Sequence, residues 1–179
     1  MMRSFEELEA LYSARPAPPA IGSLRLIVVR RQEGVHETPP LARLDLAEGL
    51  EGDRWARGAA PKRDAQVTLM NSGVAELVAA GVQPLDAAGD NLLVDVDLSS
   101  AALPVGSRVR IGAAAVLEVT ALAHTGCKKF AARFGLDALR WINWHEHEGR
   151  RLRGVNCRIV AGGAVAVGDP VEVVPLRRG

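Results

Sequence analysis

The residues best suited to chemistry lie in one short stretch, His124-Thr125-Gly126-Cys127-Lys128-Lys129-Phe130. A strand-like run, 114–122, leads into this stretch, and a helical pattern over about 130–142 follows it. A cysteine at such a junction lies near the first turn of a helix, where unpaired backbone N–H groups and the helix dipole favour negative charge. Together with Lys128 and Lys129, this position predicts a lowered thiol pKa and a Cys127 thiolate able to act as nucleophile, sulfur carrier or metal ligand. The structural alternative is a small residue that packs a strand-to-helix turn.

Basic side chains in several loops predict an anion site near this cysteine. Arginine offers a bidentate fork to phosphate and lysine a point charge, so a group of them is suited to a phosphate ligand. For each arginine taken singly, the alternative is a solvated loop charge. The candidate residues are Arg54, Arg63, Lys128, Lys129 and Arg133.

Asp90 and Asn91 follow Gly89 at another join and are further binding candidates, with an Asx turn as the alternative. Cys157 falls within a predicted strand, which favours a packing role. His145 and His147 alternate as metal ligands can, but no further Cys or His lies nearby to complete a tetrahedral zinc site. That segment is therefore predicted to be a solvated loop. The chain carries no P-loop, dinucleotide fingerprint, zinc-protease motif or serine elbow, which leaves cysteine chemistry or none.

The elements that position these residues are mainly strands. Ser4 and Glu7 form a capping box for a helix that ends near Ser13, so residues 1–22 are predicted to be an N-terminal helical arm. From residue 23 onward, many short apolar runs are separated by turns that contain glycine, and helical patterns are few. This organisation predicts a mainly β protein with a few helices, in which a closed β-barrel domain spans 23–179. Hairpins are expected at 112–113 and at Gly162-Gly163.

Length, charge and composition exclude several classes of function. The chain has 179 residues, which suits a single core, and its formal net charge of +1 argues against nucleic acid or an acidic membrane surface as a partner. Only two cysteines are present, so no disulfide framework is indicated. No apolar run reaches the length of a membrane span, and the N-terminus lacks a signal-peptide core. These features predict a soluble cytoplasmic protein.

Taken together, the residues at these loops and strand ends resemble the MOSC domain, the module named for the C-terminal part of molybdenum cofactor sulfurase. They resemble in particular its small stand-alone bacterial members. The resemblance covers about 24–174. It is carried by the order of Glu51-Gly52-Asp53-Arg54, Gln66-Val67-Thr68-Leu69, Gly89-Asp90-Asn91-Leu92, Leu103-Pro104-Val105-Gly106, Cys127 and the closing 162–169. Three positions depart from the family pattern: Trp55 stands for histidine, Asp90 for glutamate and Gly126 for proline.

This resemblance implies a β-barrel with a cysteine, here Cys127, at the rim of a pocket for the molybdenum cofactor (molybdopterin). It also implies that Cys127 carries sulfur as a persulfide or ligates molybdenum, that Asp90 and Asn91 match the family's Gly-Glu-Asn, and that Arg54 matches its Gly-Asp-Arg-His. A soft thiolate suits molybdenum, and the cationic neighbours suit the pterin phosphate. The chain lacks the aminotransferase-like domain of full sulfurases, so pyridoxal phosphate is not expected in it.

Two functional hypotheses follow, and the residues alone do not decide whether the protein is an enzyme. In one, the Cys127 thiolate ligates molybdenum, and N-hydroxylated substrates are reduced with electrons from a separate reductase. In the other, Cys127 is a non-catalytic carrier that receives persulfide sulfur from a cysteine desulfurase for metal–sulfur assembly. A structural barrel that binds a partner through its N-terminal arm is a third reading.

Overall fold

In the computed structural model, which describes residues 1–174, seven strands close into a β-barrel. The strands follow one another around the barrel in the order β1-β12-β8-β9-β10-β6-β7, and only β6 and β7 run parallel. The predicted barrel is therefore confirmed; the last residues of the predicted domain, 175–179, lie outside the described part. The barrel strands are β1 (Ile21–Ile27), β6 (Val67–Asn71), β7 (Leu92–Val94), β8 (Arg108–Ile111), β9 (Ala115–Val119), β10 (Val155–Ala161) and β12 (Pro170–Val174).

The barrel closes around an apolar core because alternate side chains of its strands point inward. In β8, Val109 and Ile111 are fully buried, whereas Arg108 and Arg110, which alternate with them, are exposed. Cys157 on β10 is also fully buried in this core, so the packing role predicted for it is confirmed. Strand alternation of this kind gives one buried face and one solvated face.

Two smaller sheets lie against the barrel. One has the order β11-β4-β5, formed by Gly163–Ala166, Leu41–Asp45 and Gly49–Leu50, and the other is the hairpin of β2 (Val29–Gln32) and β3 (Val35–Glu37). The hairpin expected at 162–163 was wrong, because β11 pairs with β4 instead of folding back on β10. Gly162 permits this pairing, since a Cβ atom there would lie 2.8 Å from the backbone oxygen of Leu44.

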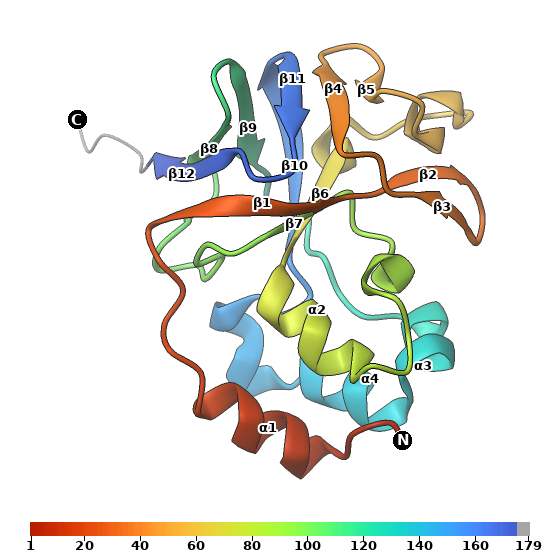
Figure 1. Ribbon diagram of the computed structural model, residues 1–179, viewed down its shortest axis with the longest axis vertical. Helices are drawn as coiled ribbons and strands as arrows, with labels where there is room; N and C mark the ends of the chain where they lie inside the picture. Colours follow the sequence, from red (N-terminus) through yellow and green to blue (C-terminus); the bar gives the residue numbers. More distant parts are fainter. Residues whose placement is uncertain (175–179) are drawn as a thin grey trace.

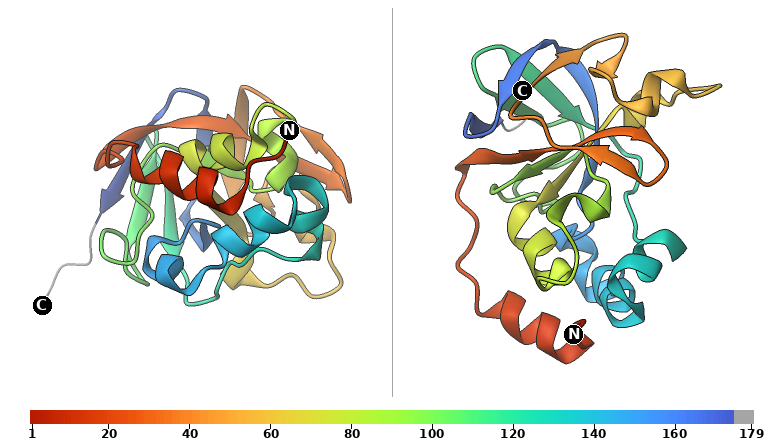
Figure 2. Two further views of the ribbon diagram at one scale, coloured as in Figure 1. Left: turned by 90° about the horizontal axis from the view of Figure 1, so that it is seen from below. Right: turned by 45° about the vertical axis from the view of Figure 1, so that its right-hand side comes forward.

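A layer of helices covers one end of the barrel, below the strands in Figure 1. The helices enclose a second apolar cluster that includes Leu8, Phe130, Phe134 and Trp141. α1 packs on α2 and α4 and lies across the outside of this layer (Figure 2). No helix within residues 1–174 is long and apolar enough to cross a lipid bilayer. The helices are α1 (Phe5–Ser13), α2 (Ser72–Ala79), α3 (Lys128–Phe134) and α4 (Leu136–Ile142), with 3-10 turns η1 (Arg54–Arg57), η2 (Arg63–Ala65), η3 (Leu85–Ala88) and η4 (His145–Arg150).

The helix after the cysteine is shorter than its sequence pattern suggests. Instead of one helix from Phe130 to Ile142, the chain forms α3 and α4, which are separated by Gly135 at φ +91°. A non-glycine residue would be strained at that angle, so glycine sets the break. At the other end of the protein, the predicted capping box of Ser4 and Glu7 is present, and α1 ends at Ser13 as expected.

Candidate functional site

Cys127 is the N-cap residue of α3, and its side chain is exposed. Hydrogen bonding from the backbone N–H of Phe130 is the largest cause that lowers the pKa of this thiol, and the N–H of Lys129 adds to it. Partial burial opposes the shift, while the charges of Arg153 and Lys129 support it. The direction agrees with the sequence prediction, because free N–H groups at a helix start stabilise a thiolate. Arg153, however, was not foreseen.

A cavity of about 170 Å³, called here the Cys127 pocket, places this thiol among cationic side chains. Of the residues predicted from the sequence, Cys127, Arg54, Lys129 and Arg133 line it. The other lining residues are Arg30, Glu33, Gly34, His36, Thr68, Ala88, Gly89, His124, Phe130 and Arg153. The arrangement can offer one soft sulfur ligand together with several donors for an anion.

Two of the predicted cations do not line the pocket. Lys128 is exposed at the start of α3, and Arg63 is exposed in η2, so neither is brought to the cavity wall in this structure. Lys129 pairs with Glu33, and the guanidinium of Arg133 donates to the carbonyl oxygen of Ala87 at 2.9 Å. The structure therefore brings Arg54, Lys129 and Arg133 to the pocket and leaves Arg63 and Lys128 outside it.

Asp90 lies behind the pocket wall rather than in it. Its side chain is fully buried and contacts Arg153 through one oxygen and Nε2 of His124, at 2.7 Å, through the other. Burial pushes the pKa of Asp90 upward, but the charges of Arg153 and His124 outweigh it and lower the pKa to about 2. Asp90 is thus an ionised anchor that orients two pocket residues, which is more than the local Asx turn considered from sequence.

A second buried carboxylate, Asp53, anchors the opposite part of the wall. Arg30 donates to it three times, from its backbone N–H, Nε and Nη2, each time at 2.9 Å, and Asn91 donates from Nδ2 at 3.0 Å. Burial raises the pKa of Asp53, but the hydrogen bonds and charge of Arg30 outweigh it, so the pKa is lowered. Asn91 also accepts from the backbone N–H of Thr68 at 3.1 Å. Its role in the structure is to tie strands together behind the pocket.

Sequence reasoning missed five lining residues that carry charge or a titratable ring: Arg30, Glu33, His36, His124 and Arg153. His124 lay inside the stretch singled out around Cys127, so its position three residues earlier was an available signal. Arg153 gave no local signal, because it meets Asp90 across 63 residues of sequence.

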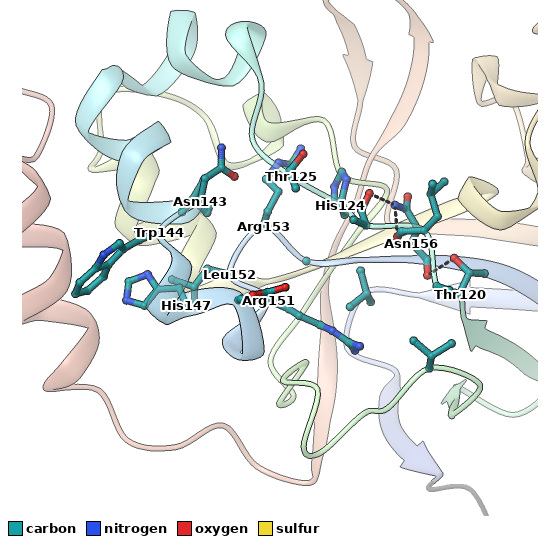
Figure 3. Close-up of a pocket in the computed structure, with 18 of the residues that line it drawn as sticks. Thr120, His124, Thr125, Asn143, Trp144, His147, Arg151, Leu152, Arg153 and Asn156 are labelled. Carbon is teal, nitrogen blue, oxygen red and sulfur yellow. Dashed lines mark hydrogen bonds between the residues drawn. The ribbon is translucent and has the colours of Figure 1, made fainter.

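A larger cavity of about 480 Å³, called here the second cavity, adjoins the Cys127 pocket through His124 and Arg153, which line both. Trp144 and His147 lie at one end of it, Thr120 and Asn156 at the other, and His124 and Arg153 between them (Figure 3). The segment predicted to be a solvated loop is the 3-10 turn η4, and it is solvated only in part: His145 is exposed, whereas the side chain of His147 is 2 % exposed. Its Nδ1 lies 2.8 Å from the carbonyl oxygen of Trp141, and its Nε2 lies 2.9 Å from Glu9 of α1.

Comparison with known proteins identifies the family. A family model, described as the MOSC domain, matches residues 62–172. The chain belongs to the MOSC domain family. No curated protein matched this MOSC domain significantly.

Solved structures share the fold of this MOSC domain. YuaD protein from Bacillus subtilis is 19% identical with a TM-score of 0.61, over 88% of this chain and 97% of that one. YiiM from Escherichia coli is 18% identical with a TM-score of 0.56, over 88% and 72% of the two chains. YiiM from Geobacillus stearothermophilus is 17% identical with a TM-score of 0.56, over 86% and 75%. At these identities the likeness concerns the fold alone.

The three departures from the MOSC pattern each have a structural counterpart here. Trp55 packs near Gly49 and donates from its indole N–H to the carbonyl oxygen of Lys62 at 3.0 Å, so it braces the 54–63 loop. Asp90 contacts Arg153 through one carboxylate oxygen and His124 through the other. Gly126 lies so close to α4 that a Cβ atom would stand 2.8 Å from Leu139. The amide of Asn143 fastens this glycine, accepting from its N–H at 2.8 Å and donating to its carbonyl at 3.0 Å.

Proposed function

We propose that this MOSC protein binds the molybdenum cofactor, that Cys127 ligates its metal, and that the loaded protein reduces N-hydroxylated substrates with electrons from a separate reductase. The observation that carries this proposal is the Cys127 thiol, whose pKa is lowered and which opens into a pocket with cationic walls. The MOSC family is associated with this cofactor. When bound, the cofactor would supply the redox chemistry, and the chain would bind and orient it.

The donor set fits such a group. Within residues 1–174, no three side chains of His, Cys, Asp or Glu converge as a metal site, and Cys127 is the sulfur donor that lines the pocket. A metal that arrives with its own pterin ligands needs few protein donors, and molybdenum accepts soft sulfur. Arg54 and Arg133 line the same pocket, where they suit the phosphate of the pterin.

The proposal is tested by molybdenum and pterin content after purification from a molybdenum-replete host. We expect wild-type protein to carry both, Cys127→Ser to lose the metal, and Cys157→Ala to keep it, because Cys157 is buried in the barrel core and away from the pocket. The Cys157→Ala control removes a thiol without touching the site. Wild-type protein that holds neither metal nor pterin would argue against the proposal.

The same exposed, low-pKa thiol favours one alternative, a sulfur carrier. The Cys127 thiolate would attack the outer sulfur of a desulfurase persulfide, forming Cys127–S–SH and releasing the desulfurase thiolate, without net oxidation. Incubation with a cysteine desulfurase and cysteine should then add the mass of one sulfur atom to wild type and to Cys157→Ala, but not to Cys127→Ser. A wild-type mass that never changes would exclude this function.

A further inference from the structure

His124 is held in one orientation by a buried anion. Its Nε2 lies 2.7 Å from Oδ1 of Asp90, whose side chain is fully buried and whose other oxygen contacts Arg153. An ionised carboxylate only accepts hydrogen bonds, so Nε2 of His124 must carry a hydrogen. The remaining ring nitrogen, Nδ1, is then the atom that can bind or release a proton. The hydrogen bond of one nitrogen sets the function of the other.

His124 lies between two cavities. The side chain is 18% exposed and lines both the Cys127 pocket and the second cavity. The second cavity also has exposed residues in its wall, Leu122 and Thr125 among them, so solvent reaches it. Figure 3 shows His124 beside Thr125 and Arg153 on the wall of this cavity. A group placed in this way can exchange protons with solvent on one side and with a ligand on the other.

We propose that His124, oriented by Asp90, delivers a proton to an N-hydroxylated substrate in the Cys127 pocket and recovers it from solvent through the second cavity. This inference rests on the proposed reductive function. Reduction of an N-hydroxylated substrate breaks its N–O bond, forms an N–H bond and releases water, which consumes two electrons and two protons. The separate reductase supplies the electrons, and the proton on Nδ1 goes to the departing oxygen. The second proton comes from solvent.

The other pocket histidine fits this role less well. His36 lines the Cys127 pocket but not the second cavity, and its Nδ1 already lies 3.3 Å from Asp86. The charged and titratable groups around His124 set the field in which it works. Facing the Cys127 pocket they are Arg30, Glu33, His36, Arg54, Cys127, Lys129, Arg133 and Arg153; facing the second cavity, His145, His147, Glu148 and Arg151; and behind the wall, Asp90.

His124 is separate from the groups that stabilise the Cys127 thiolate. Those groups are the backbone N–H of Phe130 and Lys129 and the charges of Arg153 and Lys129. Loss of the imidazole should therefore leave the pH midpoint of Cys127 alkylation in place. This separation distinguishes a proton-delivering histidine from the partner of a Cys–His pair, in which the imidazole activates the sulfur.

The test compares His124→Gln with Arg140→Gln, which changes an exposed residue of α4 that lines neither cavity. Glutamine keeps an N–H donor for Asp90 but cannot exchange a proton. In protein without added cofactor, ¹⁵N NMR of the imidazoles should show a hydrogen on Nε2 of His124, and iodoacetamide should alkylate Cys127 with the same pH midpoint in all three proteins.

In protein from a molybdenum-replete host, assayed with benzamidoxime and reduced viologen, His124→Gln should slow reduction by roughly 100-fold or more, the usual contribution of a positioned acid. Arg140→Gln should match wild type, and added imidazole should partly restore His124→Gly. Reduction by His124→Gln within a few-fold of wild type, an Nδ1–H tautomer, or a displaced alkylation midpoint would each overturn the inference alone. A wild type that reduces no N-hydroxylated substrate would overturn the proposed function, and this inference with it.

Discussion

Replacing Asp90 by Asn should remove the anchor on which one side of the pocket depends. The carboxylate is fully buried, and it neutralises Arg153, whose side chain is itself only 10% exposed. Asparagine keeps the shape but leaves the guanidinium buried without its counter-charge. Breaking a buried ion pair from one side in this way costs about 3–5 kcal/mol, so we expect the free energy of unfolding to fall by about that much at neutral pH.

The pH dependence of stability offers an independent measure of the same interaction. The pKa of Asp90 is lowered from 3.8 to about 2 in the folded protein. A lowered pKa means that Asp90 binds a proton more weakly in the folded state than in the unfolded chain. The resulting stability is fully present above 3.8 and is lost as the pH falls from there toward about 2, and a shift of this size corresponds to roughly 2 kcal/mol.

Urea unfolding followed by tryptophan fluorescence, repeated at several pH values, measures both effects. Asp64→Asn is the matched control, because its side chain is 61% exposed and lies 3.8 Å from Arg158. Such a surface pair contributes at most about 1 kcal/mol, so this control should remain close to wild type. The reasoning is refuted if Asp90→Asn unfolds within about 1 kcal/mol of wild type. A stability of Asp90→Asn that falls in acid as steeply as that of wild type would refute it too.

Three further predictions concern the thiols and the packing. Iodoacetamide should alkylate Cys127 with a pH midpoint below that of an ordinary thiol, and Lys129→Ala should raise this midpoint. Cys157 should stay unreactive in the folded protein, since burial raises the pKa of its thiol. Leu8→Ala should lower the free energy of unfolding by about 2–5 kcal/mol, measured in urea, because Leu8 is the fully buried residue of α1; an unchanged midpoint would mean that α1 does not stabilise the domain. Gly154→Ala should lower the melting temperature sharply and cost more than about 3 kcal/mol, because its φ is +99° and a Cβ atom would lie 2.0 Å from the backbone oxygen of Leu69; a stable variant would contradict this close approach.

The barrel could be predicted because its information is local. Alternating apolar residues in runs such as 108–111 and 115–119, together with the turns between them, indicate strands one by one. The partner strand of β11 could not be predicted, because β11 pairs with β4 and the paired residues lie more than a hundred positions apart in the sequence. The sequence shows a glycine at position 135, but it does not show that the backbone there adopts a positive φ and ends the helix. A tertiary contact decides whether glycine inside a helical pattern interrupts it.

The site was predictable in part for the same reason. Cys127 stood out because a helix start and two lysines are adjacent in sequence. Asp90 was selected, but its function as an anchor was not, because Arg153 and His124 approach it from segments 63 and 34 residues away. A buried carboxylate attracts whichever cations the fold brings to it. Spacing along the chain cannot name those cations in advance.

The number of cations in the pocket overstates the charge available to a ligand. Among the described residues, Arg30 is paired with Asp53, Arg153 with Asp90 and Lys129 with Glu33. These pairs are close to neutral as units, and their main effect is to hold each side chain in place, which lowers the entropy lost when a ligand binds.

Arg54 and Arg133 also line the pocket, and neither forms an ion pair with any described residue. The attraction for an anion therefore comes mainly from these two arginines, and its geometry from the pairs around them. Because the lowered pKa favours a negative sulfur at Cys127, an anionic group held near that sulfur is repelled by it. The two unpaired charges offset the repulsion between the sulfur and the ligand.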